Sequence, residues 1–462
     1  MMAGVGGGAQ LDLLSHLPDA LLVSILSRLQ LDDATRCSVL SSHWHRQISP
    51  LLLLNFRASM PRHRDVIQAA NSVLVAHPTA PVRSFCIRWN IRGGGDDTDD
   101  GGLLHELERR GVQELTFLFD DRCQRIPASV LAWASLTRLK ASSGAFPDTT
   151  TSATPLNLPR LAEIDLFGVT ISSESLHAVL SHCTALERLR IHGTSSCSSS
   201  CTRFHVRSPS LKVLDTDGGF DELFIEDAPN LEWVYGRYMN LRARCQRGVH
   251  LKVVHAPKLE LLGYLGMSFH EIEIGETIFT KDRIHVKTLM PSLKTLAIQV
   301  SYTCTGYINW IVQLLKLFPF LQTLYIKSDA WSVVQAAARE SWDLLRDVPC
   351  PCVDNHLEKV VFEVYRGHEW QREMAKFLHE RSRFLRVMEF HCLGDGDGIH
   401  KDYGKPPSKE WVRKQQELLC LDSRASRDAR FLFFRSQLVC NHFSVCDDEW
   451  YKGKYYDDLY QV

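Results

Sequence analysis

From residue 82 onward, one short hydrophobic pattern recurs along the chain. An apolar residue is followed by two variable residues, a second apolar residue, one variable residue and a third apolar residue. Clear copies start at Val82, Val112, Leu161, Leu186, Leu293 and Leu321, and weaker copies start at Leu136, Leu211, Leu231 and Leu259. From Val112 to Leu211 the starts are 24, 25, 25 and 25 residues apart. This alternation predicts a series of short strands whose apolar side chains enter one shared core.

Each predicted strand needs a return segment, and two of these segments have helical spacing. Residues 173–183 place Leu176, Val179 and Leu180 on one helix face, and residues 307–318 do the same with Ile311 and Leu315. Proline stands two residues before many strand leucines, where it ends the preceding helix: Pro159, Pro209, Pro229, Pro257, Pro291 and Pro319. A period of about 20 to 29 residues is typical of leucine-rich repeats. We therefore expect an irregular leucine-rich repeat solenoid, interrupted by a glycine- and aspartate-rich insertion at 93–102 and a serine-rich loop at 195–200.

The segment before the repeats predicts a small helical unit. Leu17 and Pro18 precede a stripe of apolar residues at helical spacing, formed by Leu21, Leu22, Ile25, Leu26 and Leu29. A second helix is predicted from Asp32 or Asp33, and Trp44 opens a third segment. Three helices in about 45 residues bury too little apolar surface to be stable alone. Their surplus apolar face either packs on the first repeat or is a docking site for another protein.

Composition places the chain among ordinary globular proteins. Its 462 residues are 45% hydrophobic and 23% charged, which indicates two domains or a repeat array. The net charge of -1, without any basic block, argues against nucleic-acid binding. The N-terminus lacks a secretory signal, and the longest strongly apolar run, 51–54, is far short of a membrane span, so we expect a soluble cytoplasmic or nuclear protein that binds no membrane. In that reducing setting the 14 cysteines are expected to be thiols.

Candidate chemistry is sparse. The acidic stretch from Asp96 begins like a calcium loop, but its twelfth position holds Leu107 instead of the glutamate ligand. Cys350 and Cys352, and the group of Cys440, His442 and Cys446, are metal-ligand types without the paired spacing of zinc knuckles. No nucleophile elbow, P-loop or dinucleotide fingerprint occurs. We therefore predict a non-catalytic protein with no catalytic, cofactor-binding or metal-binding residues, and a metal hydrolase using Cys and His remains a distant alternative.

Two stretches resemble known modules of plant F-box proteins. Residues 17–44, through Leu17-Pro18-Asp19, Ile25-Leu26-Ser27, Ser38-Val39-Leu40-Ser41 and Trp44, look like the F-box. Residues 356–390 are similar to the FBD module that often follows leucine-rich repeats in that family, with a strand, a Tyr-Arg-Gly turn, a helix and a second strand.

The resemblance implies a role in ubiquitination. An F-box docks on a Skp-type adaptor, which joins it to the cullin and RING subunit of an SCF ubiquitin ligase, while the repeats hold a substrate protein. The adaptor-binding residues carried over onto this chain are Leu17, Pro18, Leu22, Ile25, Leu26, Val39, Leu40 and Trp44. Departures from the family pattern at Gln30, Asp32 and His43 motivate an alternative, a ligase-independent interaction module with a degenerate F-box.

The predicted fold class is α+β, a small N-terminal helical F-box followed by an irregular leucine-rich repeat solenoid. The predicted organisation is an F-box at 11–57, a helical linker at 58–81, repeats at 82–345, an FBD-like module at 350–392 and a C-terminal segment at 393–462. The acidic and aromatic end of that segment, 446–462, is predicted to be a cap that packs its tyrosines on the last repeat or, alternatively, a tail that contacts a partner. We expect no cofactor.

Overall fold

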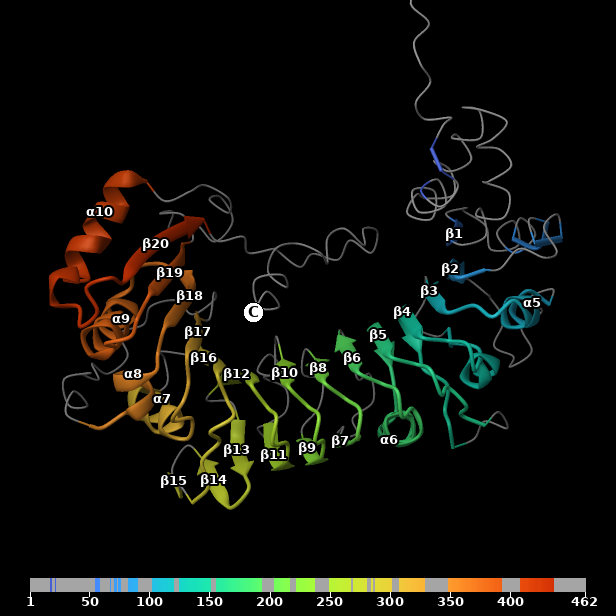
Figure 1. Cartoon of the computed structure of the whole chain (residues 1–462), viewed down its shortest axis with the longest axis horizontal. Coiled ribbons are helices and arrows are strands. Elements are labelled where there is room, and N and C mark those ends of the chain that lie inside the picture. Colours follow the sequence, from blue (N-terminus) through green and yellow to red (C-terminus); the bar gives the residue numbers. More distant parts are fainter. Residues whose placement is uncertain are drawn as a thin grey trace, which may run out of the picture. The chain divides into compact units, whose positions relative to one another are not determined.

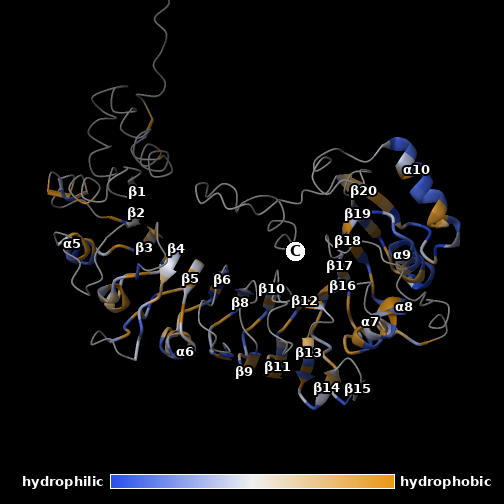
Figure 2. Cartoon of the chain, turned by 180° about the vertical axis from the view of Figure 1, so that it is seen from behind, coloured by the Kyte–Doolittle hydropathy of each residue, from blue (hydrophilic) through white to orange (hydrophobic). Residues whose placement is uncertain are grey.

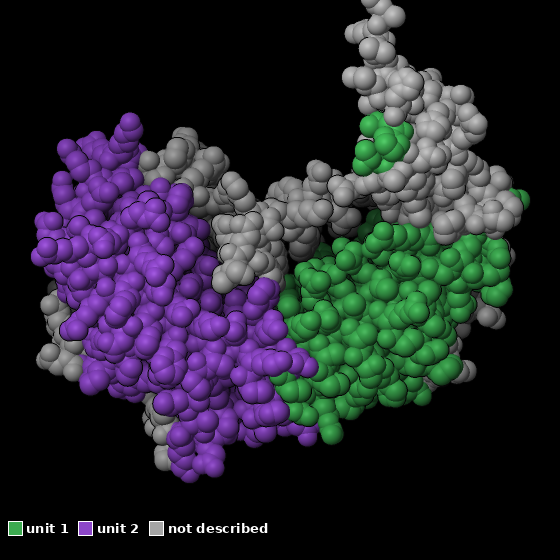
Figure 3. All heavy atoms as spheres, viewed as in Figure 1, with its two compact units in different colours: residues 1–219, 227–229 green, residues 220–226, 230–462 purple. Residues whose placement is uncertain are grey.

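A computed structural model of the chain describes residues 17–18, 21, 55–58, 67, 70–72, 74–75, 82–89, 102–119, 124–150, 155–192, 203–216, 222–236, 249–266, 269–280, 284–285, 287–300, 307–328, 348–392 and 408–435. They fall into two compact units, residues 1–219 with 227–229 and residues 220–226 with 230–462 (Figure 3). No helix in the described part of the chain is long and apolar enough to cross a membrane.

Unit 1 contains a parallel sheet with one short strand per repeat (Figure 1). Its strands follow the chain in the order β1 (Asn55–Ala58), β2 (Ser84–Trp89), β3 (Glu114–Phe119), β4 (Arg138–Ala145), β5 (Glu163–Thr170), β6 (Arg188–His192) and β8 (Val213–Thr216). The return segments hold α5 (Leu103–Arg109), the 3-10 helix η1 (Ala128–Ala132), α6 (Ser173–His182) and β7 (Arg203–Arg207), which contacts α6. The strands of this sheet from β2 onward lie where the apolar pattern predicts them, whereas β1 precedes the first copy of the pattern and was not predicted.

The register of this sheet stacks equivalent apolar residues of successive repeats. Leu115 pairs with Leu139, Leu139 with Ile164, Ile164 with Leu189, and Leu189 with Leu214. Each of these five side chains is at most 1% exposed. The predicted helix at 173–183 also forms, because Ser172 Oγ accepts a hydrogen bond from Ser175 N at 3.1 Å and caps its first turn.

Unit 2 contains a second run of parallel strands, in the order β10 (Trp233–Gly236), β12 (Leu261–Gly266), β16 (Thr295–Val300), β17 (Thr323–Ser328), β18 (Lys359–Tyr365), β19 (Val387–Cys392) and β20 (Arg430–Arg435). Five further strands of this unit belong to a second sheet, in which β14 pairs antiparallel with β13 and with β15: β9 (Glu222–Asp227), β11 (Val249–His255), β13 (Phe269–Ile274), β14 (Thr277–Thr280) and β15 (Ile284–His285). The return segment of this unit that was predicted to be helical, 307–318, forms a helix, and the second-sheet strands lie in return segments for which no helix was predicted.

The helices of unit 2 are α7 (Tyr307–Lys316), α8 (Pro351–Asn355), α9 (Glu369–Arg381), α10 (Lys409–Leu418) and the 3-10 helix η3 (Leu421–Ser423). Figure 2 shows α7 as mainly hydrophobic and α10 as mainly hydrophilic, and seven of the ten α7 residues are buried. The predicted strand–turn–helix–strand order at 356–390 is present as β18, α9 and β19. Helix α10 and strand β20 lie in the segment after residue 393, and the apolar pattern predicted neither of them.

An aromatic stack forms the core of the last strands. The Phe390 ring lies parallel to the Phe362 ring at 5.4 Å and to the Phe433 ring at 4.7 Å between centroids. The Tyr365 ring contacts Phe390 at 4.6 Å. Phe390 is 0% exposed, so β18, β19 and β20 share one apolar layer.

Several sequence predictions concern residues outside the described part of the chain. The serine-rich loop at 195–200, the group of Cys440, His442 and Cys446, and the segment 446–462 lie there, as does the insertion at 93–102 apart from Gly102. The described cysteines are free thiols, and four of them are buried as predicted for small apolar residues: Cys183, Cys350, Cys352 and Cys392. Cys350 and Cys352 place their sulfurs 3.8 Å apart. Within the described residues, no three His, Cys, Asp or Glu side chains converge as metal ligands.

Candidate functional site

The predicted adaptor-binding residues are described only at their first two positions. Leu17 is partly exposed and Pro18 is exposed. The carbonyl oxygen of Pro18 accepts a hydrogen bond from the backbone N–H of Leu21 at 2.9 Å, and the Leu21 side chain is 52% exposed. The remaining predicted positions lie outside the described residues: Leu22, Ile25, Leu26, Val39, Leu40 and Trp44. Leu17, Pro18 and Leu21 thus present apolar surface to solvent at the start of the predicted helix.

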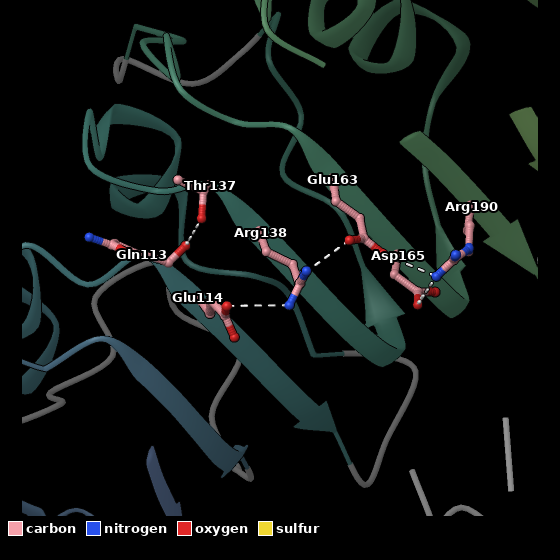
Figure 4. A network of polar contacts seen from close by, with 7 residues as sticks. All are labelled: Gln113, Glu114, Thr137, Arg138, Glu163, Asp165 and Arg190. Atoms are coloured by element: carbon pink, nitrogen blue, oxygen red, sulfur yellow. Dashed lines mark hydrogen bonds and ion pairs between the residues drawn. The ribbon is translucent and has the colours of Figure 1, made fainter. Parts of the chain in front are cut away.

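A second candidate surface lies on the unit 1 sheet, on the face opposite the apolar core. Side chains alternate along a strand, so the residues between the buried leucines point to this outward face. The strand register places Glu114, Arg138, Glu163 and Arg188 in one row, and Lys140, Asp165 and Arg190 in the row beside it. We call the linked side chains Glu114, Arg138, Glu163, Asp165 and Arg190 the charged row (Figure 4).

Ion pairs connect the charged row from strand to strand. Arg138 Nη1 lies 3.3 Å from Glu114 Oε1, and Arg138 Nε donates to Glu163 Oε2 at 2.9 Å. Arg190 Nη1 donates to Glu163 Oε1 at 3.0 Å and lies 3.7 Å from Asp165 Oδ2 (Figure 4). Opposite charges on neighbouring strands stabilise a sheet directly. Glu163 is the centre of this network, because each of its carboxylate oxygens binds a different arginine.

Burial and charge act against each other on the two central carboxyl groups. Burial alone would raise the pKa of Glu163, but the guanidinium groups of Arg138 and Arg190 outweigh it and hold that pKa below its usual value. For Asp165, burial dominates over Lys140 and Arg190 and raises the pKa. Asp165 therefore binds a proton more readily than an ordinary aspartate, whereas Glu163 holds its negative charge more firmly than an ordinary glutamate.

Glu163→Gln is expected to lower the free energy of unfolding at neutral pH by about 1 kcal/mol, since it weakens two charge-assisted hydrogen bonds. A carboxyl group whose folded-state pKa is lowered stabilises the fold above its usual pKa of 4.5 and loses that contribution as pH falls through the lowered value. The difference between the variant and the wild type should therefore shrink in acid. Urea unfolding from about pH 7 to about pH 3 measures it.

The matched control is Glu276→Gln, because the Glu276 side chain is 76% exposed and its 3.7 Å pair with Lys287 lies in solvent. That change should leave the unfolding midpoint unaltered. A Glu163→Gln effect that stays constant from neutral pH into acid would contradict the assigned role of the carboxylate.

The outward face of unit 2 has a different chemistry. Tyr264, Ala297, Tyr325 and Val361 are buried there, at most 8% exposed, and the partly buried Tyr235 packs against them. We call these five residues the tyrosine patch. The rings of Tyr235 and Tyr264 meet edge to face at 5.6 Å between centroids. Aromatic and β-branched pairs on adjacent strands stabilise a sheet through their packing. The outward face is thus charged in unit 1 and aromatic in unit 2.

Polar groups border the tyrosine patch. Tyr264 Oη donates a hydrogen bond to Glu363 Oε1 at 2.6 Å, and Lys327 Nζ lies 5.2 Å from the centre of the Tyr264 ring. Burial, followed by the negative charge of Glu363, raises the pKa of Tyr264, so its hydroxyl remains a donor. The tyrosine patch therefore stabilises the sheet of unit 2, whereas the charged row of unit 1 keeps charged side chains partly exposed, where a partner can reach them.

Both surfaces are absent from the sequence predictions, which treated these strand positions as variable. One signal was available: Glu114, Arg138, Glu163 and Arg188 alternate in sign at intervals of 24, 25 and 25 residues. Such spacing puts opposite charges side by side once the strands are parallel and in register.

A parallel sheet supplied by regularly spaced strands, with an apolar core on one side and recognition chemistry on the other, defines a repeat protein of the binding class. Three family models match the chain in sequence order. They are an F-box domain at residues 14–55, the leucine-rich repeats of FBD-associated F-box protein At5g56370 at 101–326, and an FBD domain at 347–390. The chain belongs to the plant F-box proteins with leucine-rich repeats and an FBD domain.

The names of relatives from Arabidopsis thaliana mention these domains. The putative FBD-associated F-box protein At1g55030 is 24% identical over 411 residues, which cover 84% of this chain and 92% of the relative. F-box/FBD/LRR-repeat protein At1g13570 is 27% identical over 232 residues, which cover 48% of this chain and about half, 53%, of the relative. The LRR protein LIC12759 of Leptospira interrogans is 12% identical, with 83% of this chain and 96% of that chain covered and a TM-score of 0.27.

Proposed function

We propose that the chain is the substrate-recognition subunit of an SCF-type ubiquitin ligase. Its F-box would dock on a Skp-type adaptor and, through that adaptor, on a cullin and a RING subunit. The match of the F-box model to residues 14–55, ahead of the repeats, carries this proposal. The exposed apolar surface at Leu17, Pro18 and Leu21 supports it, because a few apolar anchors supply most of the affinity in a helix-in-groove contact. Cytoplasm and nucleus are the proposed locations.

The repeat sheet is the proposed contact surface for the substrate protein. Its charged row keeps Glu114, Arg138 and Arg190 partly exposed, so unit 1 offers charged groups to a partner. No catalytic residue of the chain is needed in this role. Holding a substrate near the charged carrier enzyme raises the effective concentration of its lysines, and the partners carry out the transfer.

Co-expression of the full chain with a plant Skp-type adaptor tests the proposal. The two proteins should co-elute from a sizing column as a 1:1 complex, and addition of a cullin with its RING subunit should shift that complex to higher mass. Separate elution of chain and adaptor at micromolar concentration would overturn the ligase role.

A second candidate function is a ligase-independent interaction module. The departures at Gln30, Asp32 and His43 favour it, because charges at the rim of an interface set specificity and association rate. In that case the chain would still bind its partner protein through the repeats, and the adaptor would not join the complex. Comparing proximity labelling of the intact chain with that of an F-box deletion, with the proteasome inhibited, separates the two functions.

A further inference from the structure

One edge of unit 2 carries large exposed aromatic side chains at equivalent positions of successive repeats. They precede β17, β18 and β19, in the turns that follow α7, α8 and α9 (Figure 1). Phe320 is 48% exposed and Phe384 is 57% exposed. His356 occupies the equivalent position in the repeat between them. We call Phe320, His356 and Phe384 the edge row.

Backbone hydrogen bonds establish that these three residues form a row. Glu358 N donates to Gln322 O at 2.8 Å, and Arg386 N donates to Glu358 O at 2.8 Å, so residues 322, 358 and 386 lie on adjacent rungs. The edge row lies two residues before each of them. The rings of Phe320 and His356 are in contact, with centroids 5.0 Å apart. Two rings of the edge row are therefore in contact, and Phe384 adds a third exposed ring at the equivalent position of the next repeat. Exposed apolar surface gathered at one edge indicates an interaction site.

Arginines lie near the Phe384 end of the edge row. Ser426 Oγ donates to Leu385 O at 2.7 Å, which holds the loop before β20 against the turn that carries Arg383 and Phe384. Arg424 lies in that loop, with Nη2 at 3.4 Å from the carbonyl oxygen of Arg427. The two neighbouring stretches, 380–386 and 422–430, contain six arginines and three acidic residues. Two of these arginines, Arg381 and Arg386, form ion pairs with Asp354 and Glu358. Phenylalanine beside arginine is the composition of a protein-binding surface, and the remaining arginines offer guanidinium groups to the carboxylates of a partner.

The chain itself contains a segment of the complementary chemistry. Residues 446–460, CDDEWYKGKYYDDLY, hold five acidic residues against two lysines, and five aromatic residues. Large aromatic side chains beside carboxylates match an edge made of phenylalanine rings and guanidinium groups.

The connection between this segment and the edge row is long enough. β20 contains six residues and runs parallel to β19 from Arg430, so Arg435 lies roughly 20 Å from the edge at which the strands begin. Residues 436–445 can span about 33 Å when extended. β20 is the last strand in the order of its sheet, so a connection along the outer side of β20 would cross no other described strand.

We propose that the acidic and aromatic segment 446–460 binds in cis to the edge row, with its carboxylates at the arginines beside Phe384 and its rings on Phe384 and Phe320. This contact covers the exposed strip at the FBD end of the chain and is independent of adaptor docking. Its removal exposes an aromatic and basic surface.

Photo-cross-linking in the full chain bound to its adaptor, or in the full chain alone, tests this contact. A benzoylphenylalanine replaces Phe384, which is 57% exposed and does not support the core. Irradiation should join position 384 to peptides from 446–460, identified by mass spectrometry. The matched control places the same group at Val254, which is 53% exposed on β11, and should give no such product.

Charge removal supplies the second measurement. The combined variant Asp447→Asn, Asp448→Asn, Glu449→Gln, Asp457→Asn and Asp458→Asn should lower the cross-link yield at least about fivefold, and added salt should act in the same direction. An unchanged thermal midpoint confirms that the fold is intact. Products that join position 384 to a second copy of the chain, or to no peptide of 446–460, would overturn the proposal.

Discussion

Leu17→Ala combined with Pro18→Ala is expected to weaken binding of the Skp-type adaptor by about 100-fold. Both side chains reach solvent in the chain by itself, so they are available to a partner. Burying one leucine-sized side chain contributes about 1.5–3 kcal/mol, and two anchors together contribute about 3 kcal/mol, or roughly two powers of ten in the dissociation constant. Titration of the adaptor by isothermal calorimetry measures this loss.

The control for this variant is Val254→Ala, another exposed apolar residue outside the predicted F-box. It should leave adaptor affinity within twofold of the wild type. The double variant should unfold at the same temperature as the wild type, because neither residue is in the core. Wild-type affinity of the double variant would show that the adaptor does not use this surface.

Phe390→Ala is expected to lower the free energy of unfolding of unit 2 by about 3–5 kcal/mol. The Phe390 ring is 0% exposed and lies between the parallel rings of Phe362 and Phe433, so its loss leaves a cavity between three strands. Repeat proteins depend on contacts between neighbouring repeats, and β19 would lose its packing on both sides. Urea unfolding followed by circular dichroism measures the change.

Phe434→Ala is the matched control for that core variant. It removes the same ring from a position on β20 that is 44% exposed, so the unfolding free energy should change by less than about 1 kcal/mol. Equal destabilisation by the two changes would contradict the described packing of the last three strands.

The apolar pattern predicted the strands of the repeats because inward positions carry most of the packing energy. Leu139, Ile164 and Leu189 are required at these positions whatever the outward face binds, and all three are at most 1% exposed. The helix α6 was predictable for a related reason, since Leu176, Val179 and Leu180 recur at the spacing of one helix face and are buried.

The last repeat escaped prediction because its elements lack that signature. The strand RFLFFR has aromatic residues at adjoining positions instead of the spaced leucines of the other copies. Helix α10 buries only Gln415, which accepts a hydrogen bond from Tyr365 Oη at 3.2 Å, so no apolar stripe marks it. Elements of this kind depend on contacts with the preceding strand, and the spacing of apolar residues within the segment does not reveal those contacts.

The outward surfaces were unpredictable for a different reason. Glu163 meets Arg138 and Arg190 because three strands, separated by about 25 residues each, pair without a shift in register. A one-residue slip would turn every one of these side chains to the other face. The tyrosine patch depends in the same way on pairings between β12, β16 and β17, and one of these pairings contains a register shift. The adaptor-binding residues could be assigned from resemblance alone, and Leu17 and Pro18 are the two whose exposure is described.

The charged row restricts which substitutions related sequences can carry on the outward face of the unit 1 sheet, the proposed binding face. Because Glu163 serves two arginines at once, reversing its charge leaves like charges on three adjacent strands, whereas exchanging signs along the whole row preserves every pair. New specificities in unit 1 should therefore arise through linked changes at residues about 25 positions apart. Paired substitutions at that interval would be the evolutionary trace of selection on partner choice, distinct from the isolated changes that a loop tolerates.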